Sequence, residues 1–89
     1  MISYVLTYTD LFSFLEYLGF RDSSSSESER IFEHPQSGIV LVFAMLDDPS
    51  THRPAQPADI LSTEVRLQHH GLLDGTIRIA LERARTNSG

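Results

Sequence analysis

The sequence contains no cysteine and no lysine, and these two absences limit the chemistry and the binding partners expected of the chain. Without cysteine it forms no disulfide and offers no thiolate as a metal ligand or nucleophile. All seven basic residues are arginines, against twelve acidic residues, so the formal net charge is −5. Proteins that bind nucleic acid through its phosphates usually carry a basic excess. The negative net charge therefore disfavours RNA binding, and we expect a protein partner or self-association.

Long apolar runs are also missing. The longest run, residues 39–46, is far shorter than the roughly 20 residues of a membrane-spanning helix. The N-terminus lacks the basic start and apolar core of a signal peptide. We therefore expect no membrane association and a cytoplasmic location. A chain of 89 residues is expected to form one domain over residues 1–89, with a frayed tail over residues 85–89.

Residues 7–19 carry the clearest helix signal. Thr7 and Asp10 have the spacing of a capping box, and Gly19 suits the residue that follows a helix. Between them lies an apolar stripe at helical spacing, made of Leu11, Phe14, Leu15 and Leu18.

Residues 20–34 predict two strands joined by a loop. Residues 20–22 are expected to start a short strand, and the serine-rich residues 23–28 to form a mobile turn. Residues 28–34 alternate in character, as a strand does. Its predicted faces are Arg30, Phe32 and His34 on one side, and Glu29, Ile31 and Glu33 on the other.

Residues 35–46 complete an antiparallel hairpin. Residues 35–38 have turn chemistry throughout. The β-branched and aromatic run at residues 39–46 predicts a strand that is buried on both faces or nearly so. Residues 47–57 then hold three prolines and are expected to form a loop.

Two more helices are predicted after this loop. The first spans about residues 58–70, with Ala58, Leu61 and Val65 on its inward face, and ends at Gly71. The second starts at Asp74 as its N-cap and runs to about Arg85. Its predicted inward residues are Ile77, Ala80, Leu81 and Ala84, and its predicted outward residues are Arg78, Glu82 and Arg85. The element order predicts an α+β fold with the helices on one face of the sheet.

Four segments resemble the HicA-like, or YcfA-like, proteins: LFSFLEYLGF at residues 11–20, ERIFEHP at 29–35, GIVLV at 38–42 and GTIRIA at 75–80. The resemblance implies the α-β-β-β-α core of double-stranded-RNA-binding domains, here as a single domain with an additional C-terminal helix. It also implies a relation to toxin–antitoxin systems, since the toxin members of the family are mRNA interferases that an antitoxin neutralises.

The chain departs from the toxins at their catalytic histidine, which lies in a Gly-Ser-His triplet. Counting back from His34 and Pro35, the triplet falls on residues 27–29, so Glu29 stands in the histidine position. A carboxylate repels RNA phosphate and is a poor substitute for a cationic acid. We therefore predict no catalytic residue, no cofactor, and a non-catalytic interaction domain. It is expected to bind a protein, or a second copy of itself, through a sheet edge, the proline-rich loop or the last two helices.

The alternative is a degenerate mRNA interferase that still binds RNA. Its RNA- or phosphate-binding candidates are Arg30, His34, Gly75, Thr76 and Arg78. A phosphate would sit on the free N–H groups of Gly75 and Thr76 at the helix start. Two of these residues also have a purely structural interpretation. Arg78 is then an arginine that faces solvent, and His34 is a partly exposed histidine at a strand end that hydrogen-bonds the following turn. No histidine spacing predicts a metal site.

Overall fold

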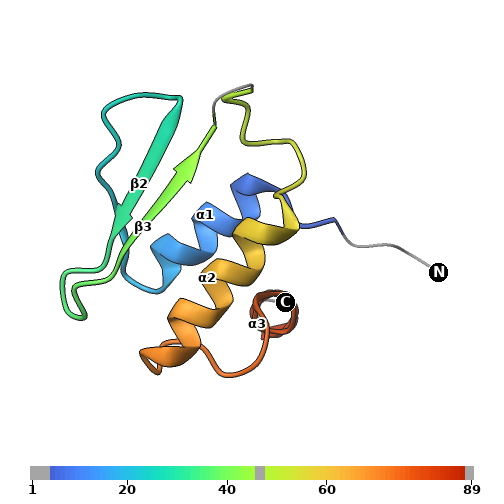
Figure 1. The fold of residues 1–89 in the computed structure, drawn as a ribbon. Helices are drawn as coiled ribbons and strands as arrows, with labels where there is room; N and C mark the ends of the chain where they lie inside the picture. The colour runs from blue at the N-terminus through green and yellow to red at the C-terminus, as the bar shows by residue number, and fades with distance from the viewer. Residues whose placement is uncertain (1–4, 46–47, 88–89) are drawn as a thin grey trace. The chain divides into compact units, whose positions relative to one another are not determined.

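The computed structural model describes residues 5–45 and 48–87, without the side chains of residues 85–87. The element order is α1 (Tyr8–Tyr17), β1 (Arg21–Asp22), β2 (Glu29–Glu33), β3 (Val40–Ala44), α2 (Pro57–His69) and α3 (Ile77–Asn87) (Figure 1). The predicted α+β class and this order are confirmed. The chain divides into two compact units, residues 1–55 and 56–89, and each is described by itself. One domain over residues 1–89 stays a prediction.

Local sequence signals fix both ends of α1. Thr7 Oγ1 accepts the N–H of Asp10 at 3.2 Å, and the Asp10 carboxylate accepts the N–H of Thr7 at 3.1 Å. At the other end the chain turns at Gly19, whose φ of 103° is costly for any residue with a Cβ. The N–H of Phe20 then bonds the carbonyl of Leu15 at 3.0 Å. The predicted capping box and glycine stop are both confirmed.

The three strands form one antiparallel sheet in the order β1-β2-β3. In the β2–β3 hairpin, Phe32 pairs with Leu41 and Glu33 pairs with Val40, as predicted for a hairpin closed by residues 35–38. Strand β1 adds only two residues, with Arg21 opposite Glu33.

Aromatic packing joins α1 to one face of this sheet, which we call the inner face. The Phe12 ring centroid lies 4.8 Å from that of Phe32 and 5.2 Å from that of Phe43. Tyr8 extends the cluster, with its ring 5.6 Å from Phe12. Other buried apolar residues of this unit are Leu6, Leu11, Phe14, Leu15, Phe20, Ile39, Leu41, Met45 and Ala55. Phe12 lies outside the predicted stripe, so the helix buries a broader face than its sequence indicates.

The prediction that the third strand is buried on both faces is wrong. Its burial alternates, because α1 covers the inner face and no described element of residues 5–55 covers the other. The side chains of Val40 and Val42 are 41% and 54% exposed. We call this side the outer face, and it consists of Glu29, Ile31, Glu33, Val40, Val42 and Ala44. Leu46, part of the same prediction, lies outside the described residues.

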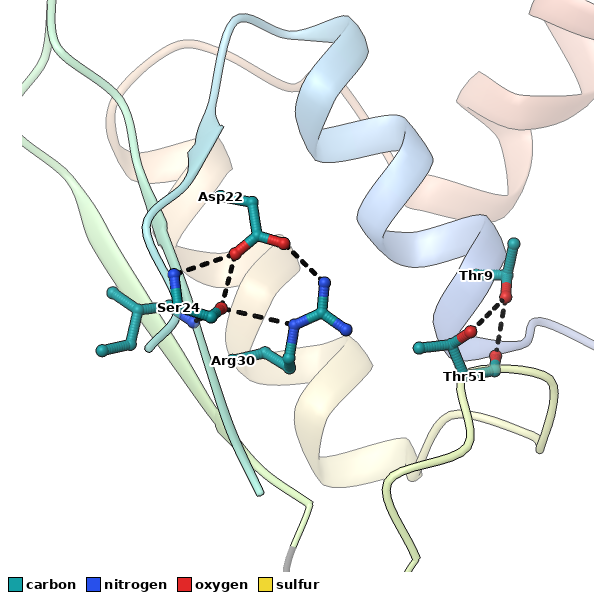
Figure 2. A network of polar contacts seen from close by, with 6 residues as sticks. Thr9, Asp22, Ser24, Arg30 and Thr51 are labelled. Carbon is teal, nitrogen blue, oxygen red and sulfur yellow. Dashed lines mark hydrogen bonds and ion pairs between the residues drawn. The ribbon is translucent and has the colours of Figure 1, made fainter. Parts of the chain in front are cut away.

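The proline-containing segment at residues 48–56 is a loop, as predicted, and it returns to the start of α1. Pro54 forms an isolated antiparallel bridge with Thr7. The Thr9 hydroxyl contacts the carbonyl and the hydroxyl of Thr51, each at 2.9 Å (Figure 2). The Arg53 guanidinium lies over the Tyr8 ring, 4.7 Å from its centroid. These contacts anchor the loop despite its lack of regular structure.

The second unit contains α2, whose predicted inward face is wrong. Leu61 and Val65 are 61% and 55% exposed, whereas Thr63 and Leu67 are buried. Tertiary packing turns the side with Thr63 and Leu67 inward, although periodicity favours the side with Leu61 and Val65. Gly71 ends the helix as predicted, and the N–H of the following residue returns to the carbonyl of Leu67 at 2.9 Å.

Helix α3 is capped by Thr76 and not by Asp74, which corrects the prediction. The Thr76 hydroxyl accepts the N–H of Ile79 at 3.2 Å, and its carbonyl accepts the N–H of Ala80 at 3.1 Å. Ile77 is buried, but Ala84 is exposed and not inward as predicted. The helix continues to Asn87, past its expected end. The outward position predicted for Arg85 concerns a side chain outside those described.

Candidate functional site

Arg30, a predicted RNA contact, is the centre of a polar network on β2 (Figure 2). Its Nη2 donates to Asp22 Oδ2 at 2.5 Å, and its Nε donates to Ser24 Oγ at 3.3 Å. The Ser24 hydroxyl donates in turn to Asp22 and accepts the N–H of Ile31 at 2.7 Å. The guanidinium is therefore held and neutralised by its own chain, and Ser24 anchors the serine-rich loop.

These contacts also set the ionisation of Asp22. Partial burial acts to raise the pKa of Asp22, but hydrogen bonds from the hydroxyl and N–H of Ser24 and from Arg30, with the Arg30 charge, outweigh it. The net pKa lies below its ordinary value, so the carboxylate is ionised at neutral pH. Asp22 and Arg30 consequently form an ion pair with side chains 30% and 23% exposed.

The guanidinium of Arg30 lies over the aromatic cluster. Its Cζ is 5.1 Å from the Phe12 ring centroid and 5.9 Å from that of Phe32, within range for a cation–π contact. Two shallow depressions flank this arginine. The first is lined by Asp22, Ser24, Ser25, Ser26, Glu27 and Arg30, and the second by Glu27, Arg30, Asp48, Pro49, Ser50, Thr51 and His52. Each places carboxylates beside the arginine, which opposes phosphate binding.

His34 is buried, with 5% of its surface exposed, and not partly exposed as predicted. Its Nδ1 accepts the N–H of Ser37 at 3.1 Å and contacts the Ser37 hydroxyl at 2.7 Å. Its Nε2 lies 3.1 Å from the carbonyl oxygen of Leu18. A neutral ring with its hydrogen on Nε2 satisfies all these partners. The predicted bond to the turn is confirmed, and neither nitrogen is left to contact RNA.

Glu29, which the resemblance sets at the toxins' histidine position, lies on the exposed outer face of the sheet. Its side chain lies on the same side of β2 as those of Ile31 and Glu33. This placement agrees with the predicted solvated face. The side chain beside the apolar surface of β3 is therefore a carboxylate and not an imidazole.

The predicted phosphate site at the start of α3 already has an anionic partner. The N–H of Ile77 donates to the Glu64 carboxylate at 2.9 Å. The carbonyl of Gly75 accepts from the Gln68 amide at 2.5 Å, and Thr76 caps the helix. Arg78 is exposed on the first turn. A phosphate on this helix end would therefore have to displace a carboxylate of the same unit.

The remaining histidines do not form a metal centre. His69 and His70 lie at the end of α2 with their rings edge to face, centroids 5.4 Å apart. Among residues 5–45 and 48–87, no group of three or more histidine, aspartate or glutamate side chains is placed to hold a metal ion. No helix in the described part of the chain combines the length and apolar character that crossing a bilayer requires.

The backbone of β3 provides a second kind of candidate site. β3 ends the strand order, so one of its edges has no strand neighbour within the described residues. Ile39 and Met45 bond toward β2, through the contacts His34 N–H to Ile39 O and Met45 N–H to Ser28 O. Because hydrogen bonding alternates along an antiparallel strand, the N–H and C=O groups of residues 40, 42 and 44 point to the open edge.

Sequence reasoning missed two parts of these sites. The sequence predicts a short strand at residues 20–22 and indicates no role for Asp22, although the spacing Asp22-x-Ser24 is typical of an Asx turn. The sequence predicts a sheet edge as one possible binding surface but does not place it at β3, because the run at residues 39–46 indicates a buried strand.

The chain was compared with known proteins at three levels. No family model, no curated protein and no solved structure matches it.

Proposed function

We propose that this chain is a non-catalytic interaction domain of the HicA-like kind, which binds a protein strand at the open edge of β3. The order α1-β1-β2-β3-α2 is the one that the resemblance implies, with α3 as the additional helix. The three-stranded antiparallel sheet supports the same relation. The observation that carries the proposal is the edge itself: a regular strand with an open row of backbone groups and no charge from Val40 to Ala44.

Such an edge is a docking template for another strand. Natural proteins usually protect exposed edges with lysine, proline or an inward-pointing charge. Residues 40–44 (VLVFA) carry none of these. An added strand would gain main-chain hydrogen bonds from the edge and side-chain contacts from Val40 and Val42. The unprotected edge of β3 therefore supports strand binding as the role of this surface.

The arrangement of imidazoles supports the non-catalytic part of the proposal. His34 is buried with both ring nitrogens engaged, and Glu29 stands at the position where the toxins have histidine. Arg30 is paired with Asp22. An interferase needs groups that bind phosphate and groups that move protons. On the described residues of β2, such groups are either replaced by a carboxylate or already paired within the chain.

A degenerate, RNA-binding interferase remains the second candidate, and one observation favours it. The second depression brings Arg30 and His52 into one lining near the N-terminal end of β2. Glu27 and Asp48 share that lining, so the local charge opposes an RNA backbone. We therefore rank RNA binding below protein binding.

Nuclear magnetic resonance of the ¹⁵N-labelled chain tests both candidates. The probe for strand binding is a short synthetic peptide of alternating valine and threonine, and the expected result is shifts centred on the amides of Val40, Val42 and Ala44. Val42→Pro removes one edge donor without touching a β2 bond and should abolish these shifts. Val42→Thr, which keeps the donor, should retain them. Shifts elsewhere, or none at all, would contradict the proposal.

The RNA arm uses a labelled single-stranded RNA and a labelled hairpin. We expect no cleavage and no retention at low salt, and no gain of cleavage in Glu29→His. Retention that falls steeply with added salt and is lost in Arg30→Ala and His52→Ala would favour the RNA-binding candidate instead. Arrest of host growth on expression would likewise indicate a working toxin.

A further inference from the structure

We propose that the strand received by β3 is the β3 strand of a second copy of this chain, paired antiparallel about Val42 in a two-fold dimer. This inference rests on the proposed function, because it names the occupant of the same edge. The backbone groups of residues 40, 42 and 44 face that edge. A two-fold axis beside Val42 sets each Val42 opposite the other and each Val40 opposite Ala44 of the second copy.

This register is self-complementary in its side chains. On the outer face it pairs valine with valine, a β-branched combination that stabilises neighbouring strands. On the inner face it sets Leu41 beside Phe43 of the second copy. Both residues already belong to the core, at 4% and 2% exposure. The two sheets would therefore join into one without placing a polar group against an apolar one.

Charge distinguishes edge pairing from stacking of two outer faces. The chain has a net charge of −5, and Glu29 and Glu33 lie on each outer face. Stacked faces would hold these carboxylates about 10 Å apart across a largely dry gap. In edge pairing the two β2 strands are separated by three strand spacings, about 14 Å. This exceeds the Debye length of about 8 Å at physiological salt, so the repulsion is screened.

The length of the edge sets the expected affinity. Five residues in β3 bury less surface than the roughly 1,200 Å² of a standard stable interface. The dimer should therefore be reversible, with a Kd on the order of 10–100 μM. Sedimentation equilibrium over a range of concentrations should show a monomer–dimer transition. On dilution, amide shifts should change most at Val40, Val42 and Ala44, a readout that needs no substitution.

A charge swap at Val42 tests the two-fold register. Its side chain is 54% exposed, so V42K and V42E should fold normally. Each variant alone places like charges directly opposite one another and should remain monomeric. An equal mixture of the two should recover the dimer, because lysine then faces glutamate. V42T is the matched control and should dimerise as the wild type does.

Three results would overturn the inference: a wild-type monomer up to about 1 mM, a dimer that persists in V42K, or a mixture that stays monomeric. The valine–threonine peptide separates this failure from that of the proposed function. If the wild type is monomeric but the peptide still shifts the β3 edge amides, only self-pairing is wrong. If neither occurs, the strand-binding function fails as well.

Discussion

The imidazole of His34 ties the end of β2 to the end of α1 through the carbonyl of Leu18, 3.1 Å from Nε2. The same ring accepts the N–H of Ser37 in the following turn. It also packs on Phe20, with ring centroids 4.9 Å apart. Two segments that are distant in sequence, residues 18–20 and 34–37, thus meet at one buried side chain. The histidine before Pro35 acts as a structural connector and not as an exposed reactive group.

We expect His34→Ala to lower the free energy of unfolding by about 2–3 kcal/mol. The substitution leaves a cavity and deprives the carbonyl of Leu18 and the N–H of Ser37 of their partners. Urea denaturation followed by circular dichroism measures the effect. His52→Ala, at an exposed loop position, is the control and should stay within about 0.5 kcal/mol of wild type. Equal stability of the two variants would contradict the connector role.

The Asp22–Arg30 pair should make stability depend on pH in the acid range. Because the pKa of Asp22 is lowered in the folded state, the unfolded chain takes up this proton first as the pH falls. The contribution is complete above the ordinary aspartate pKa of about 3.9 and is lost as pH falls through the lower folded value. Asp22→Asn should therefore cost about 1 kcal/mol near neutral pH and progressively less below about pH 4.

Unfolding curves at several pH values between neutral and strongly acidic conditions check this prediction. Glu29→Gln is the matched control, because Glu29 is exposed on the neighbouring end of β2. Its difference from wild type at neutral pH should be small, because the Glu29 side chain is exposed. An Asp22→Asn difference that grows on acidification would reverse the sign and refute the assignment.

Truncation to alanine should destabilise the protein at Leu67 of α2 but have almost no effect on stability at Leu61. Leu67 is fully buried, whereas Leu61 is 61% exposed. Leu67→Ala should cost about 3 kcal/mol and lower Tm by 10 °C or more, roughly. Leu61→Ala should change stability by less than about 0.5 kcal/mol. Both substitutions remove the same atoms from the same helix, so calorimetry of the pair measures which face is packed.

Local signals account for most of what the sequence predicted correctly. Thr7, Asp10 and Gly19 fix the ends of α1 through contacts within a few residues, so their spacing is sufficient. The alternation around Arg30, Phe32 and His34 likewise depends only on strand geometry. Such features require no knowledge of what packs against the element.

The errors arise where distant packing decides between equivalent local patterns. Apolar residues lie on more than one side of α2, and periodicity does not reveal that Thr63 and Leu67 are the buried pair. An unbroken apolar run reads as a central strand, yet Val42 lies on an open edge and an uncovered face. The role of Asp22 depends on the strand register that brings it to Arg30. The candidate sites were therefore less predictable than the elements that carry them.

Glu64 should decide whether the start of α3 binds phosphate. Its carboxylate accepts the N–H of Ile77 and occupies the favourable anion position at the helix N-terminus. Inorganic phosphate should therefore leave the amides of Gly75, Thr76 and Ile77 unshifted in the wild type. Glu64→Gln should lower stability by about 0.5–1 kcal/mol, because a neutral amide interacts less with the helix dipole. Glu33→Gln, on the exposed outer face, should not.

The same variant tests the phosphate site predicted from the sequence. With the carboxylate removed, phosphate should shift these amides weakly, since Arg78 is on the adjacent turn. Shifts that already occur in the wild type would mean that phosphate displaces Glu64. That result would restore Gly75, Thr76 and Arg78 as an RNA-contacting group. If phosphate shifts these amides in neither protein, the helix start is not an anion site. The Glu64 carboxylate is absent from the variant, so it could not explain the lack of binding there.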